Sequence, residues 1–144
     1  MSLFTNLFSS IIPKSQPSKK EVVYLSGNAS YEMDITGEAD YQAALEDLCG
    51  PRLPEGVNRI ETAWLVVNDN RTDSNKNAVR VEIQGRLVGF LNLEDTIRYR
   101  RYLNAKGKPK AHGQCRALIK GGWVNSDGSQ GPYYVALDIL ALTS

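Results

Sequence analysis

The sequence predicts a mainly β fold with some helix: a small, strongly bent barrel of the OB-like or SH3-like kind, with six or seven strands and two flanking helices. In residues 79–84, Val and Ile alternate with Arg, Glu and Gln, which is the period of a half-exposed strand. A short Gln84-Gly85 turn then leads into a second apolar segment, 86–91. Beyond the N-terminal segment, helical spacing occurs in only two short stretches, so helices are insertions between strands.

The first half of the chain supplies three strands and one helix. Strands are expected at 21–25, 30–36 and 62–68. A helix follows Gly37, with Asp40 as its N-cap and apolar residues at helical spacing, and Gly50-Pro51 ends it. Residues 51–59 are expected to form a surface loop.

The second half supplies the remaining strands and a second helix. Strands are predicted at 77–84, 86–91, 114–120 and 133–140. Asn92 is the expected N-cap of a helix over 93–104, which should pack through Leu93, Ile97 and Leu103. Gly121-Gly122 breaks the strand before it, and the loop up to Pro132 is rich in turn residues.

The length of 144 residues fits a single barrel domain, predicted over 21–144, preceded by a distinct segment, 1–20. Within that segment, residues 3, 4, 7, 8, 11 and 12 are large and apolar at helical spacing, and 13–20 has the composition of a linker. The opposite face of the predicted amphipathic helix is polar but uncharged, which disfavours a membrane-surface helix. We expect residues 1–12 to dock on this domain, on a second copy or on a protein partner.

Composition excludes several classes of protein. The chain is 42% hydrophobic and 23% charged, with no apolar run near the roughly 20 residues that span a bilayer. Residues 1–13 lack the pattern of a secretory signal, and the two cysteines are far apart, so we expect a cytoplasmic protein with free thiols. A single histidine excludes a two-histidine metal site and leaves little material for a catalytic triad, so the sequence predicts neither an enzyme nor a bound cofactor.

Charge is distributed unevenly along the chain. Residues 27–70 contain nine acids and two bases, whereas residues 98–126 contain eight bases and no acid. Within the second region, Lys106, Lys108 and Lys110 alternate with Gly and Pro in a short loop that can follow a phosphate backbone. Two interpretations remain open: a positive field that favours a polyanion, or ordinary solvated charges.

Four aromatic residues are candidates for stacking a nucleobase. Tyr41 could stack a base, but it also begins the apolar stripe of the first helix, which slightly favours packing. Phe90 lies in an apolar strand and is more readily explained as core. Trp64 alternates with Leu65, so one of the two points outward, and Trp123 follows two glycines and is the better candidate for an exposed ring. His112 is expected on an exposed loop.

The ordered segments resemble those of the HIRAN domain. They are Gly37-Glu38-Ala39-Asp40-Tyr41-Gln42-Ala43-Ala44-Leu45, Asn77-Ala78-Val79, Gln84-Gly85-Arg86-Leu87-Val88-Gly89-Phe90-Leu91, Cys115-Arg116-Ala117-Leu118-Ile119-Lys120-Gly121-Gly122 and Tyr133-Tyr134-Val135-Ala136-Leu137-Asp138. The resemblance covers about 37–139 and implies an OB-like barrel, found alone in bacteria and phages or fused to DNA translocases. In the translocase members it implies binding of single-stranded DNA and capture of a free 3′ end.

The chain departs from that family at the end-binding loop. Ser74-Asn75 stands where family members commonly carry Tyr-Asp, so an amide replaces the carboxylate and the stacking ring is missing. Basic and histidine contacts of the translocase member are also replaced, by Phe90 and Leu93. We therefore expect the loop to face the ligand without a strict requirement for a 3′ hydroxyl.

Two functions from different classes follow from the sequence. The first is a non-catalytic module that binds single-stranded DNA or DNA ends; the second is a protein–protein interaction or regulatory domain. The nucleic-acid hypothesis names as its contacts Tyr41, Ser74, Asn75, Lys76, Asn77, Arg100, Arg101, Lys106, Lys108, Lys110 and Trp123.

Overall fold

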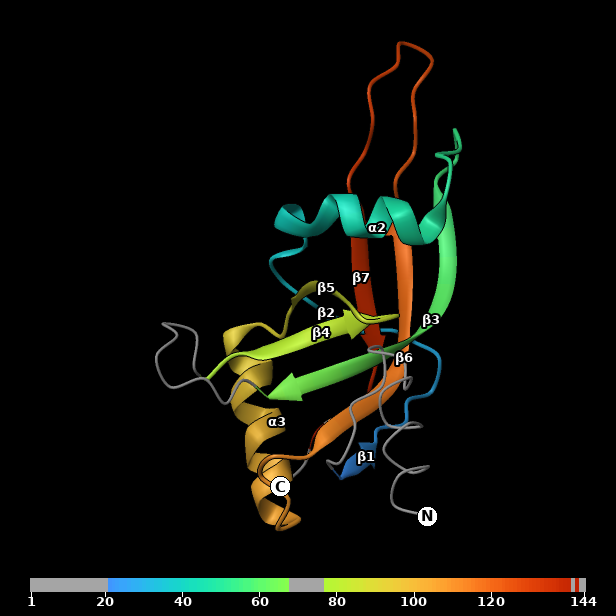
Figure 1. The fold of residues 1–144 in the computed structure, drawn as a ribbon. Helices are drawn as coiled ribbons and strands as arrows, with labels where there is room; N and C mark the ends of the chain where they lie inside the picture. Colours follow the sequence, from blue (N-terminus) through green and yellow to red (C-terminus); the bar gives the residue numbers. More distant parts are fainter. Residues whose placement is uncertain (1–20, 68–76, 141, 143–144) are drawn as a thin grey trace, which may run out of the picture.

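The computed structural model describes residues 21–67, 77–140 and 142. They form one seven-stranded sheet that curls into a half-barrel, and the mainly β fold predicted from the sequence is confirmed. Helix α2 crosses the sheet near one end, α3 lies near the opposite end, and a long hairpin extends beyond α2 (Figure 1). The predicted helix within 1–12 and the linker lie outside the described residues.

The elements follow one another as β1 (Val22–Tyr24), β2 (Met33–Asp34), the 3₁₀ helix η1 (Glu38–Tyr41), α2 (Gln42–Cys49), β3 (Val57–Val67), β4 (Val79–Ile83), β5 (Arg86–Phe90), α3 (Leu93–Ala105), β6 (His112–Gly121) and β7 (Tyr133–Asp138). The strand order is β2-β7-β6-β3-β4-β5, and β1 runs parallel to β6. Thr36 and Phe90 exchange two backbone hydrogen bonds of 2.8 Å, which link the segment after β2 to β5. This bridge brings the two ends of the strand order together.

Strand alternation separates a core face from an outer face. On β6, Cys115, Ala117 and Ile119 are buried in the core, whereas Arg116 and Lys120 are exposed on the other side. The same alternation on β3 buries Ala63 and Leu65 and turns Thr62 and Trp64 outward. We call the side of β1, β3 and β6 that carries Trp64 and Arg116 the outer face. Burial of each large apolar side chain in the core contributes roughly 1.5–3 kcal/mol.

Strand β3 is longer than the sequence indicates. It begins at Val57, so the predicted surface loop ends before residue 57 rather than at 59. Its pairing with β6 runs without a break from Val57 and Gly121 to Leu65 and Gly113. The hydrogen bonds that make 57–61 a strand therefore come from a segment more than 50 residues away, which local pattern does not reveal.

The first helix begins differently from the prediction. Asp40 was expected as its N-cap, but the chain enters α2 through the 3₁₀ turn η1, and Tyr41 occupies the cap position without a side-chain hydrogen bond. Gln42 instead holds the helix start to β7, with Nε2 donating to the Tyr133 carbonyl at 3.1 Å and Oε1 accepting from the Tyr133 amide at 2.8 Å. A tertiary bond thus replaces the expected local cap.

The second helix has the predicted cap but buries a different face. Asn92 accepts a 2.8 Å hydrogen bond from the Asp95 amide, which confirms the N-cap. The buried residues are Thr96, Tyr99 and Leu103, whereas Leu93 is 78% exposed and Ile97 is 50% exposed. The prediction that Leu93 and Ile97 face the core is wrong, because α3 packs on the barrel through a different face, the one that carries Tyr99.

Gly113 lets α3 approach β6 at this point. The Tyr99 hydroxyl lies where a side chain on Gly113 would project, so any larger residue would overlap it. Leu25, next to β1, packs against the same position. The first half of β6 is therefore flanked by β1 and covered on its core side by Tyr99 of α3.

Candidate nucleic-acid interface

Three side chains form a row across three neighbouring strands on the outer face. Gln114 of β6 is in register with Tyr24 of β1 on one side and with Trp64 of β3 on the other. Tyr24 is 72% exposed, and Trp64 and Gln114 are half-buried. Because adjacent strands lie about 4.8 Å apart, the backbone positions of Tyr24 and Trp64 are separated by about 10 Å. We refer to Tyr24, Gln114 and Trp64 as the aromatic row.

The local sequence explains why these rings point outward. Val23 and Leu25 are buried on either side of Tyr24, so strand alternation turns Tyr24 to the outer face. Leu65 is fully buried, so of these two neighbours it is Trp64 that points outward. Aromatic side chains on β1 and β3, the two strands that flank β6, present flat apolar surface, which suits stacking on unpaired bases.

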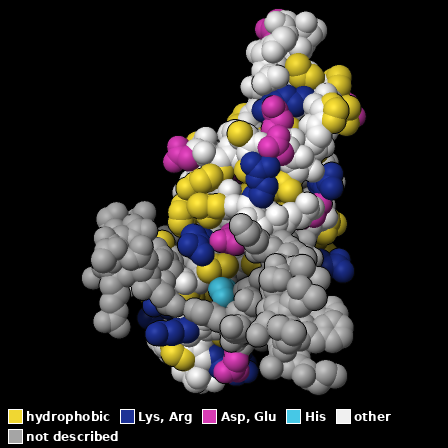
Figure 2. All heavy atoms as spheres, viewed as in Figure 1, with side chains coloured by type: hydrophobic (Ala, Val, Ile, Leu, Met, Phe, Trp, Pro, Cys, Tyr) yellow, Lys and Arg dark blue, Asp and Glu magenta, His cyan; other side chains and the backbone are white. Residues whose placement is uncertain are grey.

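Two cations continue along the outer face of β6. Arg116 lies two residues beyond Gln114, and Lys120 lies four residues further. Both are exposed, and within the described residues the side chain of neither forms an ion pair or a hydrogen bond. Over the face shown in Figure 2, Lys and Arg lie among Asp and Glu rather than in one block. For binding a polyanion, cations without an acidic partner therefore matter more than the net charge of this face.

The predicted basic loop precedes β6 and lies beside the start of β1. Lys108 Nζ is 3.2 Å from Glu21 Oε2, and the His112 amide donates to the Glu21 carbonyl at 2.9 Å. The loop therefore lies beside the start of β1, about 10 Å from Tyr24, three residues along the strand. Lys106 lies 5.1 Å from the centre of the Tyr102 ring, and Lys110 is exposed. Lys108 alone of the three has an acidic partner among the described residues.

The predicted helix bases contribute less. Arg101 is exposed on α3, but Arg100 is half-buried and one of its terminal nitrogens, Nη1, is buried without a hydrogen bond in the described structure. Arg98 is engaged with two acids of its own helix, Glu94 at 2.5 Å and Asp95 at 3.7 Å. Of the cluster on α3, Arg101 is the residue best placed to meet solvent or a ligand.

Trp123 does not join the basic loop. It follows β6, whereas the loop precedes it, so the ten-residue strand places them about 30 Å apart. Trp123 is half-buried rather than exposed: it forms a bridge with Leu53, and its indole covers Gly131, where any side chain would overlap the ring. The expectation of an exposed ring at Trp123 is therefore corrected, and Tyr24 fills that role.

The remaining predicted contacts lie elsewhere. Tyr41 is half-buried, with its ring centre 6.2 Å from that of Phe90, so it packs at the surface rather than in the core. Asn77 is exposed in the turn before β4. Ser74, Asn75 and Lys76 lie outside the described residues. Neither Tyr41 nor Asn77 belongs to the aromatic row.

A hollow of about 560 Å³ opens beside the aromatic row, and we call it the groove. Its lining comes from β1 and the following loop, from β3 and β6, and from the end of β7: Tyr24, Leu25, Ser26, Gly27, Asn28, Ala29, Thr62, Gln114, Cys115, Arg116 and Asp138. Asp138 is buried, and both carboxylate oxygens accept the Ala29 amide at 3.0 Å. The groove therefore combines a ring, a cation, an amide and a fixed carboxylate.

The thiol of Cys115, the phenol of Tyr99 and the imidazole of His112 are all buried. Burial raises the pKa of the Cys115 thiol to about 12, so it is protonated at neutral pH and a poor nucleophile. Burial also raises the pKa of Tyr99 well above its ordinary value. His112 is buried in β6, and the expectation that it lies on an exposed loop is wrong. Within the described residues, no cluster of three or more His, Cys, Asp or Glu could hold a metal ion.

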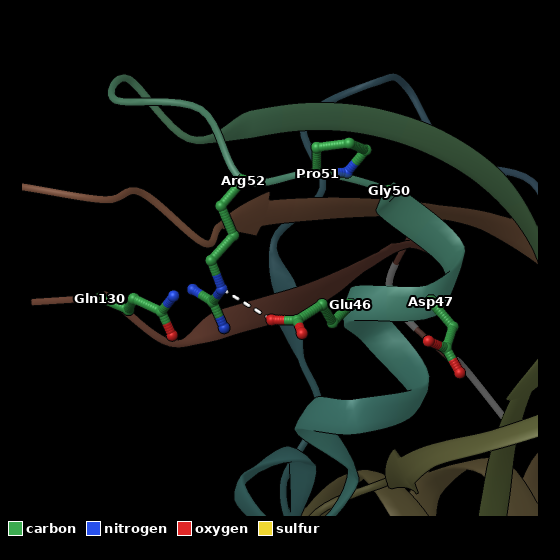
Figure 3. A pocket seen from close by; sticks show the side chains of 6 residues that line it. All are labelled: Glu46, Asp47, Gly50, Pro51, Arg52 and Gln130. Atoms are coloured by element: carbon green, nitrogen blue, oxygen red, sulfur yellow. Dashed lines mark hydrogen bonds and ion pairs between the residues drawn. The ribbon is translucent and has the colours of Figure 1, made fainter. Parts of the chain in front are cut away.

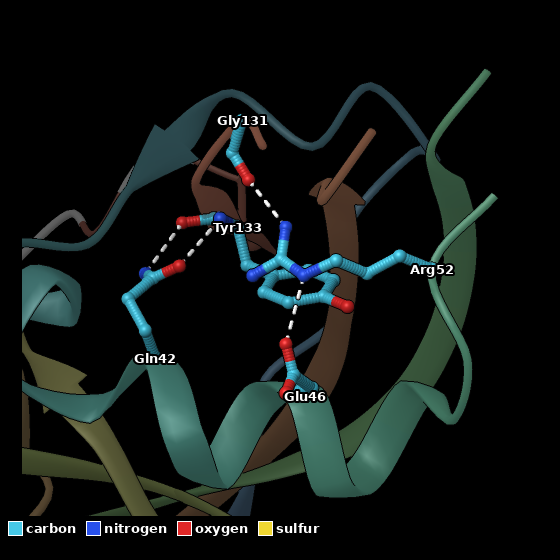
Figure 4. A network of polar contacts seen from close by, with 5 residues as sticks. All are labelled: Gln42, Glu46, Arg52, Gly131 and Tyr133. Carbon is cyan, nitrogen blue, oxygen red and sulfur yellow. Dashed lines mark hydrogen bonds and ion pairs between the residues drawn. The ribbon is translucent and has the colours of Figure 1, made fainter. Parts of the chain in front are cut away.

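A second hollow, of about 410 Å³, lies at the opposite end of the sheet, near the C-terminus of α2 (Figure 3). Arg52 projects along it and binds Glu46 at 2.8 Å and the Gly131 carbonyl at 2.7 Å. Its guanidinium also lies over the Tyr133 ring (Figure 4). Because these donors are used in holding the hairpin to α2, we assign this site a structural role.

Sequence reasoning missed Tyr24, Gln114, Arg116 and Asp138 as neighbours. A signal existed for Tyr24, since the alternation of Val23, Tyr24 and Leu25 predicts that it faces away from the core. No local signal places β1 beside β6, because that parallel pairing joins residues about 90 positions apart. The groove therefore depends on the topology.

Comparisons with protein-family models, with curated proteins and with solved structures find no match to this chain. The resemblance to the HIRAN domain stays a prediction from the sequence. Neither described helix has the length and apolar character that crossing a membrane requires.

Proposed function

We propose that this protein is a non-catalytic module that binds single-stranded nucleic acid, with DNA as the first candidate, on the outer face of β1, β6 and β3. The observation that carries the proposal is the aromatic row, in register across three strands and next to the unpaired Arg116. Binding of single strands without strict sequence preference combines stacking rings with a basic path for the backbone. The row supplies the rings, and the loop 106–110, Arg116 and Lys120 supply the path.

The path has a suitable length and direction. From Gln114 to Lys120 the outer face of β6 extends about 20 Å, and the basic loop adds to it at the other end. A single strand lying along β6 would meet Lys106 and Lys110, then the aromatic row, then Arg116 and Lys120. Duplex DNA does not offer its base faces to such a surface, so we expect a preference for single strands.

A titration of the full chain tests this proposal. Fluorescence anisotropy with a labelled oligo-dT should report binding that weakens as salt rises, and matched duplex should bind less tightly. Replacing Tyr24 or Trp64 by Ala should weaken binding about fivefold or more for each ring, whereas Tyr24→Phe should keep most of the affinity. Tyr24 is largely exposed, so its truncation leaves the fold intact.

The matched control is Leu93→Ala, which removes an exposed apolar side chain on α3, away from the outer face. Equal affinity of wild type, Tyr24→Ala and Trp64→Ala would overturn the proposed interface. Oligonucleotides ending in 3′-OH and 3′-phosphate form a further arm: the Ser74-Asn75 sequence leads us to expect less than about tenfold preference for the hydroxyl.

The alternative function, protein–protein interaction, is favoured by one observation. Leu93 and Ile97 are both exposed at i,i+4 on α3 and form a small apolar strip. Apolar docking there would be insensitive to salt, unlike binding through phosphates. The salt series therefore separates the two functions.

A further inference from the structure

Arg116 and Asp138 are opposite charges in register on neighbouring strands, yet they do not pair. Arg116 of β6 faces Asp138 of β7, and no ion pair joins these two described residues. Both line the groove beside the aromatic row. A cation and a carboxylate that stand close without neutralising each other can both bind a third group.

The carboxylate is held in place by the loop that follows β1. Asp138 is 7% exposed and accepts the amides of Ala29 at 3.0 Å, with both oxygens, and of Tyr31 at 3.4 Å, with Oδ1. Ala29 and Tyr31 adopt left-handed backbone, with φ of 68° and 49°, a conformation that is costly for residues with a side chain. Oδ1 thus accepts two amides and Oδ2 accepts one, so the remaining acceptor site of the carboxylate lies on Oδ2.

The loop also approaches Asp138 at Gly27. A side chain at this position would overlap the carboxylate, so the absence of a Cβ lets the backbone lie against it. Nearby, the Leu140 amide donates to the Ser26 carbonyl at 3.1 Å, which fastens the same loop to the end of β7. The acceptor is thus pre-positioned rather than mobile, as a recognition group should be.

The other walls of the groove complete a site for a planar ring. Tyr24 offers a stacking face, Gln114 an amide and Thr62 a hydroxyl, and the volume of about 560 Å³ lies in the range of small-molecule sites. Arg116 offers two parallel N–H donors, which match two adjacent acceptors. The ligand that fits must present paired acceptors on one edge and donors on another.

Of the two purine bases, only guanine presents this pattern. Its O6 and N7 accept a bidentate arginine, and its N2 amine can donate to the remaining acceptor site of a carboxylate. Adenine offers arginine only one acceptor on that edge, next to a donor. We infer that the groove binds a single guanine base, with Arg116 on O6 and N7, Asp138 on the donor edge and Tyr24 against the ring.

The guanine could belong to a single strand or to a free guanine nucleotide. The first form of the inference rests on the proposed function and deepens it. Anisotropy titrations of the full chain would compare oligo-dT with the same oligonucleotide carrying one central dG, dA or dC. We expect dG to tighten binding about tenfold over dA, since one bidentate contact discriminates by about 1–3 kcal/mol. Equal binding of all four oligonucleotides overturns the strand-borne form of the inference but leaves the proposed function standing.

Changes in the base avoid the risk that a variant misfolds. Replacing dG by inosine removes the N2 amine that would meet Asp138, and replacing it by 7-deazaguanine removes an acceptor for Arg116. Each replacement should abolish most of the tenfold tighter binding that we expect for dG over dA. Arg116→Lys should lose it too, whereas Lys120→Gln, on the same face but outside the groove, should weaken all oligonucleotides equally.

A separate titration with guanosine 5′-monophosphate and adenosine 5′-monophosphate distinguishes the two sources. If no oligonucleotide binds, the proposed function fails, and preferential binding of the guanine nucleotide still supports the groove. Binding of neither nucleotide, together with no dG preference, rejects guanine recognition altogether.

Discussion

The guanidinium of Arg52 lies over the ring of Tyr133, with 4.7 Å between the guanidinium carbon and the ring centre. Its side chain is only 13% exposed, and it also binds Glu46 and the Gly131 carbonyl. One side chain thus ties α2, the hairpin and β7 together. A cation–π contact away from water contributes up to about 2 kcal/mol, so this arginine should matter for stability.

Replacing Arg52 by Met should lower the free energy of unfolding by about 1–3 kcal/mol, because the cation–π contact and two hydrogen bonds are lost together. Urea denaturation measures this directly. Arg86→Met is the matched control: Arg86 binds Asp47 at 2.7 Å, but both side chains are well exposed, and such surface pairs contribute about 0–1 kcal/mol. Equal losses in the two variants would contradict the structural role assigned to Arg52.

Tyr99→Phe should leave the protein as stable as wild type or more stable, by up to about 1–3 kcal/mol. The Tyr99 hydroxyl is buried and has no hydrogen-bond partner within the described structure, so removing it ends a desolvation cost. Thermal or urea unfolding would show the change, with Tyr102→Phe, a half-buried neighbour, as the control. A clear loss of stability in Tyr99→Phe would mean that the hydroxyl is satisfied in solution.

Alkaline pH should destabilise the protein through Cys115. Its pKa is raised from 9.0 to about 12 by burial, so above pH 9 the unfolded chain releases the proton while the folded chain retains it. The stabilising contribution is complete below pH 9 and is lost as pH rises toward 12, by roughly 1.4 kcal/mol for each pH unit. Cys115→Ala should show a shallower fall of the unfolding midpoint between neutral pH and pH 10.

Thiol labelling tests the burial of Cys115 independently. Native Cys115 should react slowly with a thiol reagent at pH 8, and denaturant should make it react quickly. Cys49, which is half-buried, is the internal comparison. Rapid modification of Cys115 in the native protein would contradict the packing of β6 described above.

The three loop lysines should differ in their effect on nucleic-acid binding. Lys106 and Lys110 have no acidic partner among the described residues, whereas Lys108 lies 3.2 Å from Glu21. If each free cation meets one phosphate, Lys106→Gln with Lys110→Gln should reduce the slope of log affinity against log salt by about 1.4. Lys108→Gln should change it less. An unchanged slope when Lys106, Lys108 and Lys110 are all replaced by Gln would remove the loop from the interface.

Deleting residues 1–18 should change the oligomeric state or the solubility while the barrel stays folded. The basis is the six-residue apolar stripe within 3–12, since exposed apolar surface of that size promotes association. Light scattering would measure the mass, and circular dichroism would check the fold. The same mass in both chains would argue against a docking role for this segment.

The amino-acid sequence by itself determined the fold class and most strands, because alternation in 79–83 and the turn at Gln84-Gly85 are local signals that burial of one sheet face enforces. It also determined the cap at Asn92, which needs only a side-chain oxygen three residues before an amide. The basic loop was likewise visible as a run of charges.

Tertiary structure alone decided which residues share a surface. The parallel pairing of β1 with β6 brings Tyr24 beside Gln114, and the pairing of β6 with β7 brings Arg116 beside Asp138, across separations that local periodicity does not encode. The packing of α3 on the barrel through Tyr99 likewise determines which face of that helix is buried, and it leaves Leu93 exposed to solvent. Alternation tells which way a side chain points, but only strand order and register tell what lies next to it.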